Sequence, residues 1–540
     1  MSRVSYKFII NAIIITAPLL VLTGIILFPA IYNASLFFIG IEAFIVSLIA
    51  MAVKRRRIGY FFWLMYCLLL GCQVASLSST GNFIIPLTLS NLGEYRAVGN
   101  EALAKMVGVV FSFIIFSLFF LRVKPVLKTN KIIALLVLLI FIPGAIYHSV
   151  TTSYFFYKQS FYRPSYDYPE IAKKYLKFDI YHPGAQVDSY IKTRPKSVIV
   201  IFTEGFSSKV IDRENNKGLN LTPNIDSYYK EGLVFKNYYN HTAATFRGLR
   251  GQLTSAYQYK DGIDGKGEGF FQISSGKVND TYKHRLISLP EILNDYGYNT
   301  YFLASTEKES NLNALLKTMP FKKVYGMEDF SWHKNDRMSD KKTFESLKEL
   351  LSEQDREKPF FIGVYPSGTH HGMDSPDLIY NEGKNAFYNK FHNYDAQLGG
   401  FVRFFKDSPY YKNTILIITA DHSTFPVPEF KSSFDIHANF FVDTIPLIIL
   451  GNDIKSNIVD AKGYNSLSLA PTILNVLGIN NHSNYFLGCS LFDKQCVSEF
   501  SHQSAIGDDF YQIKKMDNDK YDTFPDEKNK KIIEYYNVSG

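Results

Sequence analysis

The chain of 540 residues is too long for one ordinary domain, and it is 46% hydrophobic and 16% aromatic. Its formal net charge of +8 owes much to basic clusters between apolar runs, so the charge does not indicate a nucleic-acid-binding protein. These averages hide a division, because residues 1–150 are nearly all apolar whereas the rest has an ordinary globular composition.

Five long apolar runs occupy the first 150 residues. A helix needs about 20 apolar residues to cross a bilayer, and so many long runs with almost no interior charge argue against buried helices of a soluble protein. Further runs follow the first, which argues against a cleaved signal peptide. We therefore predict a five-span transmembrane domain, with spans near Phe8–Tyr32, Ala34–Val53, Gly59–Ser79, Met106–Leu121 and Ile132–Val150.

Basic residues predict the orientation of these spans. They gather before the first span, after the second (Lys54–Arg57) and between the fourth and fifth. All three groups fall on one side if the spans alternate, and the positive-inside rule assigns that side to the cytoplasm. The domain after Val150 is then exported, in an oxidising compartment where Cys489 and Cys496 are expected to form a disulfide.

The exported part is predicted to have three sections: a partly helical membrane-surface linker (151–196), a catalytic domain (197–500) and a polar C-terminal tail (501–540). Apolar runs alternate with helical patterns from residue 197 onward, which predicts an α/β doubly wound sheet with helices on both faces. Expected strands include Ser197–Thr203, Asn299–Ala304, Phe360–Tyr365, Ile415–Ala420 and Thr444–Leu450, and expected helices include Thr222–Glu231, Ser288–Tyr296, Lys341–Gln354, Phe387–Phe405 and Ser466–Leu477.

Three of the expected strands end at acidic or histidine residues. Ligands collect beyond the carboxyl ends of parallel strands, and zinc and manganese accept both carboxylate and imidazole ligands. Each residue alone is as readily a turn-capping acid or a packing histidine, but their joint placement predicts a divalent metal site. The residues are Glu204, His370, His371, Asp421 and His422, with His437 in a later loop.

The segment His241–Ser255 (HTAATFRGLRGQLTS) offers a nucleophile. A metal ion lowers the pKa of a nearby hydroxyl, and arginines supply forked donors to phosphate oxygens. On chemistry alone the hydroxyls of Thr242, Thr245, Thr254 and Ser255 compete, with Arg247 and Arg250 as the phosphate-binding candidates. The alternative is a capped helix with basic surface residues.

Several segments together resemble one family. They include IFTEGF, TPNIDSYYKEGLVFKNYY, SLPEILNDYGYNTYF and FHNYDAQLGGFVRFFKDSPYYKNTILIITADHS. The chain resembles the alkaline phosphatase/sulfatase superfamily, and within it the membrane-bound group of lipoteichoic-acid-synthase-like proteins and phosphoethanolamine transferases. The resemblance covers nearly the whole length, from the spans through the linker to the exported domain.

The resemblance implies a role for each candidate residue. Glu204, Thr245, Asp421 and His422 would bind the metal, zinc or manganese, and Thr245 would be the nucleophile. His371 and His437 would be catalytic residues that stabilise charge on the substrate's phosphate oxygens and assist proton transfer. Further substrate contacts would come from Arg247, from His370 and from the Trp332–Arg337 segment, with Trp332 and Arg337 as the named residues.

The same resemblance implies a phosphotransferase of the bacterial inner membrane. Its donor would be a phospholipid, its acceptor an envelope glycan or lipid, and its intermediate a phosphothreonine. Three departures bear on substrate: the sulfatase signature of Cys or Ser followed by Pro and Arg is absent around Thr245, Ser423 follows the Asp-His pair, and one cysteine pair replaces several. The alternative is a membrane-anchored phosphodiesterase, phosphatase or sulfatase-type hydrolase.

Overall fold

A computed structural model shows two compact units, one formed by residues 1–162 with 426–436 and the other by 163–425 with 437–540. The structure describes residues 3–27, 33–53, 55–80, 83–84, 100–122, 141–161, 173–215, 218–258, 286–333, 337–436, 441–506, 509–517, 520–526 and 529–539.

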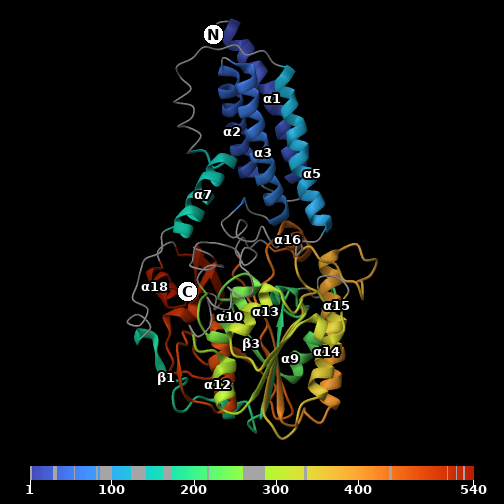
Figure 1. The fold of residues 1–540 in the computed structure, drawn as a ribbon, viewed down its shortest axis with the longest axis vertical. Coiled ribbons are helices and arrows are strands. Elements are labelled where there is room, and N and C mark those ends of the chain that lie inside the picture. Colours follow the sequence, from blue (N-terminus) through green and yellow to red (C-terminus); the bar gives the residue numbers. More distant parts are fainter. Residues whose placement is uncertain are drawn as a thin grey trace. The chain divides into compact units, whose positions relative to one another are not determined.

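The first unit is helical, with α1 (Arg3–Leu27), α2 (Asn33–Ala52), α3 (Arg56–Thr80), α5 (Asn100–Ser117) continued by a short 3-10 turn, α7 (Ala145–Phe161) and α16 (Pro428–Phe434) (Figure 1). Among the described residues, four helices are long and apolar enough to cross a membrane, in α1, α2, α3 and α5 with its 3-10 extension. The fifth predicted span, Ile132–Val150, is described only from residue 141 onward, where 145–150 form the start of α7, so the count of five stays a prediction.

Apolar side chains lie on both the inside and the outside of this bundle. Trp63 and Phe113 are fully buried, whereas Ile25 is 68% and Phe37 63% exposed. A soluble helix bundle would turn polar side chains outward. An apolar outer face is typical of helices surrounded by lipid.

The interior of the bundle also holds polar side chains, among them the buried carboxylate of Glu42 on α2. Its Oε2 accepts the backbone N–H of Ile146, 2.9 Å away in the first turn of α7. The N–H groups at a helix start lack partners within the helix, and a carboxylate satisfies them. Glu42 therefore ties the start of α7 to α2.

The second unit is built on an eight-stranded sheet. Its four central strands are buried along their whole length, as expected of strands covered on both faces. The order is β5 (Lys323–Tyr325), β4 (Asn299–Ala304), β6 (Phe360–Tyr365), β2 (Ser197–Thr203), β7 (Thr414–Ala420), β8 (Ile448–Leu450), β3 (Leu233–Lys236) and β9 (Asn457–Asp460).

The sheet is mixed rather than wholly parallel. Strand β8 runs antiparallel to both of its neighbours, β7 and β3. The connection from β7 to β8 spans residues 421–447, and α16, the helix described in it, is grouped with the first unit rather than with the sheet. Parallel neighbours are instead usually joined by a crossover helix that packs on the sheet. The predicted α/β fold is confirmed, with this correction to its strand directions.

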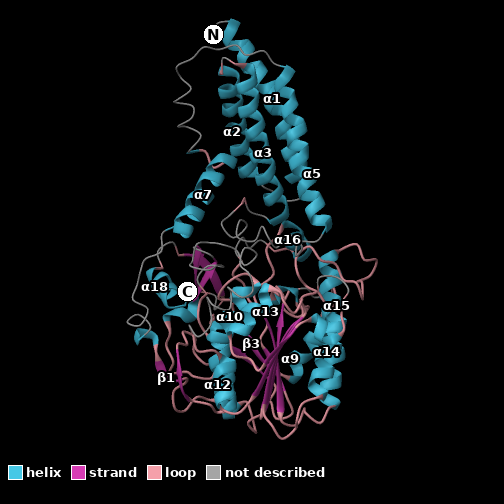
Figure 2. Ribbon diagram, in the orientation of Figure 1, coloured by secondary structure: helices cyan, strands magenta, loops and turns pink. Residues whose placement is uncertain are grey.

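Helices cover the sheet in two groups, which lie on opposite sides of the strands in Figures 1 and 2. In the first group α14 (Asp340–Ser352) and α9 (Pro223–Glu231) both pack against α15 (Ala386–Asp407). In the second, α10 (Thr245–Thr254) contacts α12 (Leu289–Asp295), α13 (Asn311–Thr318) and α17 (Leu469–Leu477). At the start of α12 the backbone N–H of Ser288 donates to Oε2 of Glu291 (3.3 Å), which is one half of the predicted capping box.

The end of the chain folds despite its polar composition. β11 (Gln503–Ile506), β12 (Asp509–Lys515) and β13 (Tyr521–Pro525) form an antiparallel sheet, and α18 (Lys530–Ser539) follows. Ile532 and Tyr535 of α18 are fully buried in a cluster with Tyr257 and Phe500. Farther back, β1 (Lys177–Asp179) in the linker pairs with β10 (Asn481–Asn484), so both flanking sections contribute to the second unit.

Cys489 and Cys496 form the predicted disulfide. Replacing both with serine should lower the free energy of unfolding by about 2–3 kcal/mol, because the unfolded chain regains the entropy of an open loop. Thermal unfolding of the purified full-length variant would measure the loss. Reducing agent should lower the melting temperature of the wild-type protein by a similar amount and leave that of the serine variant unchanged. If the wild type and the variant had the same melting temperature without reducing agent, the prediction would be contradicted.

Candidate metal centre and nucleophile

Two neighbouring strands deliver the acidic residues of the candidate site. β2 and β7 are parallel and in register, so that Thr203 pairs with Ala420 at their carboxyl ends. Glu204 and Asp421 are the next residues along each strand, and they therefore lie side by side. The predicted convergence of these strand ends is what the structure shows.

Glu204, Asp421 and His422 form one compact cluster. Their ligand atoms lie within 4.8 Å of one another, and all three side chains are buried. Nε2 of His422 is 3.4 Å from Oε1 of Glu204 and 3.6 Å from Oδ2 of Asp421. Two carboxylates and one imidazole are a donor set that zinc and manganese accept.

Hydrogen bonds turn the remaining ligand atoms inward. Oδ1 of Asp421 accepts the backbone N–H groups of Gly205 (2.8 Å) and His422 (2.7 Å), whereas its buried Oδ2 has no hydrogen-bond partner. Nδ1 of His422 is 2.7 Å from the carbonyl oxygen of Ser423, which can only accept, so Nδ1 carries the proton. The other ring nitrogen of His422, Nε2, is also buried and has no hydrogen-bond partner. Buried polar atoms are costly when unpaired, and a cation among them would satisfy both.

The charges of the cluster also favour a cation. Burial and the adjacent Glu204 carboxylate raise the pKa of Asp421 well above its usual value. Burial opposes the charge on His422, yet Asp421 and Glu204 raise its pKa to about 9. Burial also opposes the charge on Glu204, but the hydrogen bond and charge of His422 lower its pKa. The cluster thus carries excess negative charge that a proton or a metal ion must balance.

Thr245 is the hydroxyl that the structure brings to this cluster. It begins α10, and its Oγ1 donates to Oε2 of Glu204 at 2.8 Å. The three competing hydroxyls donate to backbone carbonyls instead: Thr242 to Ala505, Thr254 to Arg250 and Ser255 to Leu467. The fold therefore separates four candidates that the sequence leaves equivalent.

Close packing of α10 on the end of β7 holds Thr245 in place. Gln252 donates from Nε2 to the carbonyl oxygens of Ala420 (2.9 Å) and Asp421 (3.1 Å). Gly248 lies on the same helical face, where a Cβ atom would be 2.3 Å from the carbonyl oxygen of Asp421. Ala244, just before Thr245, has φ +75° and ψ 142°, a conformation that costs a non-glycine residue energy.

Replacing Gly248 with alanine should therefore damage the site. The added methyl group meets backbone rather than a flexible side chain, so α10 or Asp421 must move, at a cost of about 1–3 kcal/mol. We expect a lower melting temperature and weaker metal binding, measured on the same preparation. Gly108, where a Cβ would meet nothing within 4 Å, provides the matched control; wild-type metal binding in Gly248→Ala would contradict this packing argument.

The loop after β6 carries the two predicted histidines. Burial, and then the charge of Arg337, lower the pKa of His370 to about 4 against the opposing charge of Glu204. Thr369 donates to the carbonyl oxygen of Glu204, and the buried Lys390 donates to that of His370 at 3.1 Å. The ring of His371 instead stacks on Phe387 of α15. His370 interacts electrostatically with Glu204.

The other predicted substrate residues are only partly placed. Arg337 lies near the centre, since its charge acts on both Tyr365 and His370, and Nε1 of Trp332 donates to its carbonyl oxygen at 3.2 Å. Arg247 is buried in α10. His437 lies outside the described residues, so its role stays a prediction, as do the substrate contacts of the others.

Sequence reasoning missed Tyr365 and Lys390. Tyr365 ends β6, and its hydroxyl donates to Oε2 of Glu204. Burial and the charge of Glu204 raise the pKa of Tyr365 well above its usual value, so the phenol keeps its proton. The strand-end rule that selected Glu204 would also have selected Tyr365. Nothing in the sequence distinguishes Lys390 from an ordinary helix-surface lysine.

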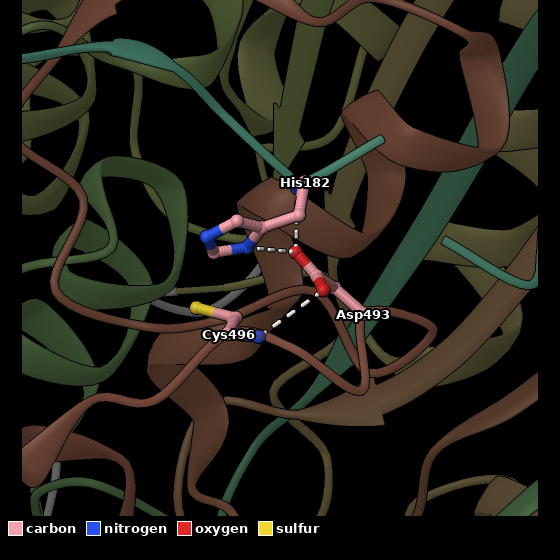
Figure 3. Close-up of side chains that lie close together, drawn as sticks. All are labelled: His182, Asp493 and Cys496. Carbon is pink, nitrogen blue, oxygen red and sulfur yellow. Dashed lines mark hydrogen bonds and ion pairs between the residues drawn. The ribbon is translucent and has the colours of Figure 1, made fainter. Parts of the chain in front are cut away.

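A second cluster of ligand-type residues lies elsewhere in the second unit. His182, Asp493 and Cys496 are close together in Figure 3. Oδ2 of Asp493 accepts from the backbone N–H of His182 (2.7 Å) and lies 2.8 Å from Nδ1 of the same residue, and Oδ1 accepts from Cys496 N (3.1 Å). The sulfur of Cys496 is bound to that of Cys489 and offers no thiolate. This cluster fastens the linker to the disulfide loop.

Comparison with known proteins gives the family. The family model described as Sulfatase matches residues 196–479, which is more than half of the 540 residues.

The chain belongs to the sulfatase family.

Solved structures of other proteins share the fold. An alkaline phosphatase superfamily protein from Vibrio parahaemolyticus matches at 19% identity over 69% of this chain and 94% of that one, with a TM-score of 0.51. The lipoteichoic acid synthase LtaP from Listeria monocytogenes matches at 16% identity over 69% and 95%, with a TM-score of 0.50. At these identities the likeness shows a shared fold. A third structure is the integral membrane protein lipooligosaccharide phosphoethanolamine transferase A from Neisseria meningitidis. It matches at 10% identity over 88% of this chain and 95% of that chain, with a TM-score of 0.49.

The predicted resemblance to the alkaline phosphatase/sulfatase superfamily is thereby confirmed. Glu204, Asp421 and His422 all lie within the residues matched by the family model. The family model stops at residue 479, so β11 to β13 and α18 lie beyond it.

Proposed function

We propose that this protein is a metal-dependent membrane phosphotransferase. It would move a phospholipid head group, phosphoethanolamine or phosphoglycerol, onto a cell-envelope glycan or lipid through a phosphothreonine intermediate. The observation that carries the proposal is the 2.8 Å hydrogen bond from Oγ1 of Thr245 to Oε2 of Glu204, beside two buried ligand atoms without partners. The sulfatase-family fold and the four candidate spans support it.

In the first half of the reaction the chain would use Thr245 and Glu204. The Thr245 hydroxyl passes its proton to Glu204 while Oγ1 forms a bond to phosphorus and the bond from phosphorus to the diacylglycerol oxygen breaks. A zinc or manganese ion held by Glu204, Asp421 and His422 would supply positive charge that favours the ionised hydroxyl. Glu204 would then pass this proton on, through water, to the departing diacylglycerol oxygen, so that diacylglycerol leaves as the neutral alcohol.

In the second half an acceptor hydroxyl attacks the phosphothreonine. Its proton needs a base, and the geometry offers His370: Nδ1 is 2.7 Å from the carbonyl oxygen of His371 and so carries the proton, which leaves Nε2 as acceptor. With a pKa of about 4, His370 is neutral at pH 7. The phosphoryl–Thr245 bond breaks, and Oγ1 of Thr245 regains a proton when His370 gives up, through water, the one it took from the acceptor.

The apolar helices favour a lipid donor and an inner-membrane location with the second unit exported. A hydrolase would use the same residues with water as acceptor, and the two functions differ in their products. The full-length protein should be reconstituted in vesicles of phosphatidylethanolamine or phosphatidylglycerol with a labelled head group. Diacylglycerol release that requires the divalent metal and Thr245, with the label passing to an acceptor lipid, is the expected result. Free phosphorylated head group appearing at the same rate without acceptor would instead establish a hydrolase.

A further inference from the structure

Tyr365 occupies a central position between the ligand cluster and the candidate nucleophile. Its side chain is buried at the end of β6, which is parallel to β2 and pairs Val364 with Ile201. Its hydroxyl donates to Oε2 of Glu204 and lies 3.4 Å from Oγ1 of Thr245. One phenol therefore contacts both a ligand carboxylate and the hydroxyl proposed to attack phosphorus.

The two oxygens of Glu204 have different surroundings. Oε2 accepts hydrogen bonds from Tyr365 and from Thr245 (2.8 Å), whereas Oε1 faces Nε2 of His422 at 3.4 Å. A carboxylate whose one oxygen is held by two hydroxyl donors cannot rotate freely. Its other oxygen is then presented to the cluster in one orientation. Such outer partners of metal-ligating groups set both the orientation and the affinity of the ligand.

We propose that Tyr365 is a positioning residue that locks Glu204 through Oε2 and leaves Oε1 to bind the metal ion. This inference rests on the metal-dependent function proposed above. Thr245 loses its hydroxyl hydrogen when it carries the phosphoryl group, and Tyr365 is then the remaining described donor to Oε2. The hydrogen bond from Tyr365 to Oε2 of Glu204 is therefore most important in the covalent intermediate.

A purely structural tyrosine would behave differently. Tyr257 is also buried, and its hydroxyl donates to the backbone carbonyls of Phe500 (3.2 Å) and Gln503 (2.9 Å) rather than to a ligand residue. Tyr257→Phe removes a buried hydroxyl just as Tyr365→Phe does. The control should lower the melting temperature but leave metal affinity unchanged, so the two roles can be told apart.

The test is a metal titration of the full-length, metal-free protein in detergent. Zinc or manganese affinity is measured by competition with a chromophoric chelator for wild type, Tyr365→Phe and Tyr257→Phe. We expect Tyr365→Phe to raise the dissociation constant by about 10–100-fold, with wild-type affinity in Tyr257→Phe. Thr245 phosphorylation, followed by mass spectrometry at saturating metal, should fall in Tyr365→Phe only.

Wild-type affinity in Tyr365→Phe would overturn the positioning role and leave the proposed function intact. If the wild-type protein bound neither zinc nor manganese, the proposed metal-dependent function would be contradicted. If Tyr365→Phe fails to fold, p-aminophenylalanine at position 365 keeps an N–H donor in the same place. This variant should bind the metal with a dissociation constant within about threefold of that of the wild type. A weaker affinity in this variant would count against the positioning role of Tyr365.

Discussion

Thr245→Ala is expected to abolish head-group transfer, with a loss of at least about 10³-fold in the rate of diacylglycerol release. The reason is chemical, because no other described hydroxyl of the segment 241–255 reaches the ligand cluster: Thr242, Thr254 and Ser255 donate to backbone carbonyls. The rate should be measured with the protein reconstituted in donor vesicles at saturating metal.

Thr245→Ser is the matched variant. It keeps the hydroxyl and loses only a methyl group, so it should retain a measurable rate and a covalent intermediate. Thr254→Ala removes a buried hydroxyl from the other end of α10 and should leave transfer near the wild-type rate. If Thr245→Ala transferred as fast as wild type, the nucleophile would have to be sought elsewhere.

The second large effect concerns the metal. Removing it with a chelator should stop transfer, and adding zinc or manganese back should restore it. At a free concentration about 100 times the dissociation constant, binding stabilises the folded state by about 2.7 kcal/mol. For a unit of this size, formed by residues 163–425 and 437–540, that corresponds to a rise in melting temperature of roughly 3–4 °C.

Asp421→Asn should remove this stabilisation. Oδ1 of an asparagine can still accept from the backbone of Gly205 and His422, but an N–H₂ group then takes the place of the unpartnered Oδ2. The metal-free variant should be at least as stable as the metal-free wild type, because the carboxylate pair with Glu204 is gone. Its melting temperature should not rise with metal.

Asp395→Asn is the control for this substitution. Asp395 is also buried, but its oxygens accept from the backbone N–H groups of Asn224 and Ile225 at the start of α9. This variant should lose stability at the helix start yet keep the full metal-dependent rise. A metal-dependent rise of wild-type size in Asp421→Asn would show that the ion binds elsewhere.

The ligand cluster could be predicted from the sequence because parallel strand ends meet at one edge of a sheet. Glu204 and Asp421 each follow a continuous run of apolar residues, and burial on both faces makes such runs easy to recognise. Their neighbourhood then follows from the topology alone. No comparable rule places a residue at the start of a helix such as α10, and Thr245 therefore needed either the fold or a family resemblance to be chosen.

Other features depend on information that a hydrophobic pattern does not contain. The pattern of Ile448–Leu450 is the same whether the strand is parallel or antiparallel, so the direction of β8 was not predictable. The section 501–540 has a polar average, and a few buried side chains such as Ile532 and Tyr535 suffice to anchor it. The position of Tyr365 at a strand end is visible in the sequence, but the contact of its hydroxyl with Glu204 appears only in the fold.

The most direct test of this account is tandem mass spectrometry of the purified protein after incubation with phosphatidylethanolamine or phosphatidylglycerol and metal. The account predicts a phosphoethanolamine or phosphoglycerol adduct on Thr245, absent from Thr245→Ala, and the mass of the adduct would name the donor. An adduct on a different residue, or turnover of either lipid with no adduct even after rapid quenching, would contradict it.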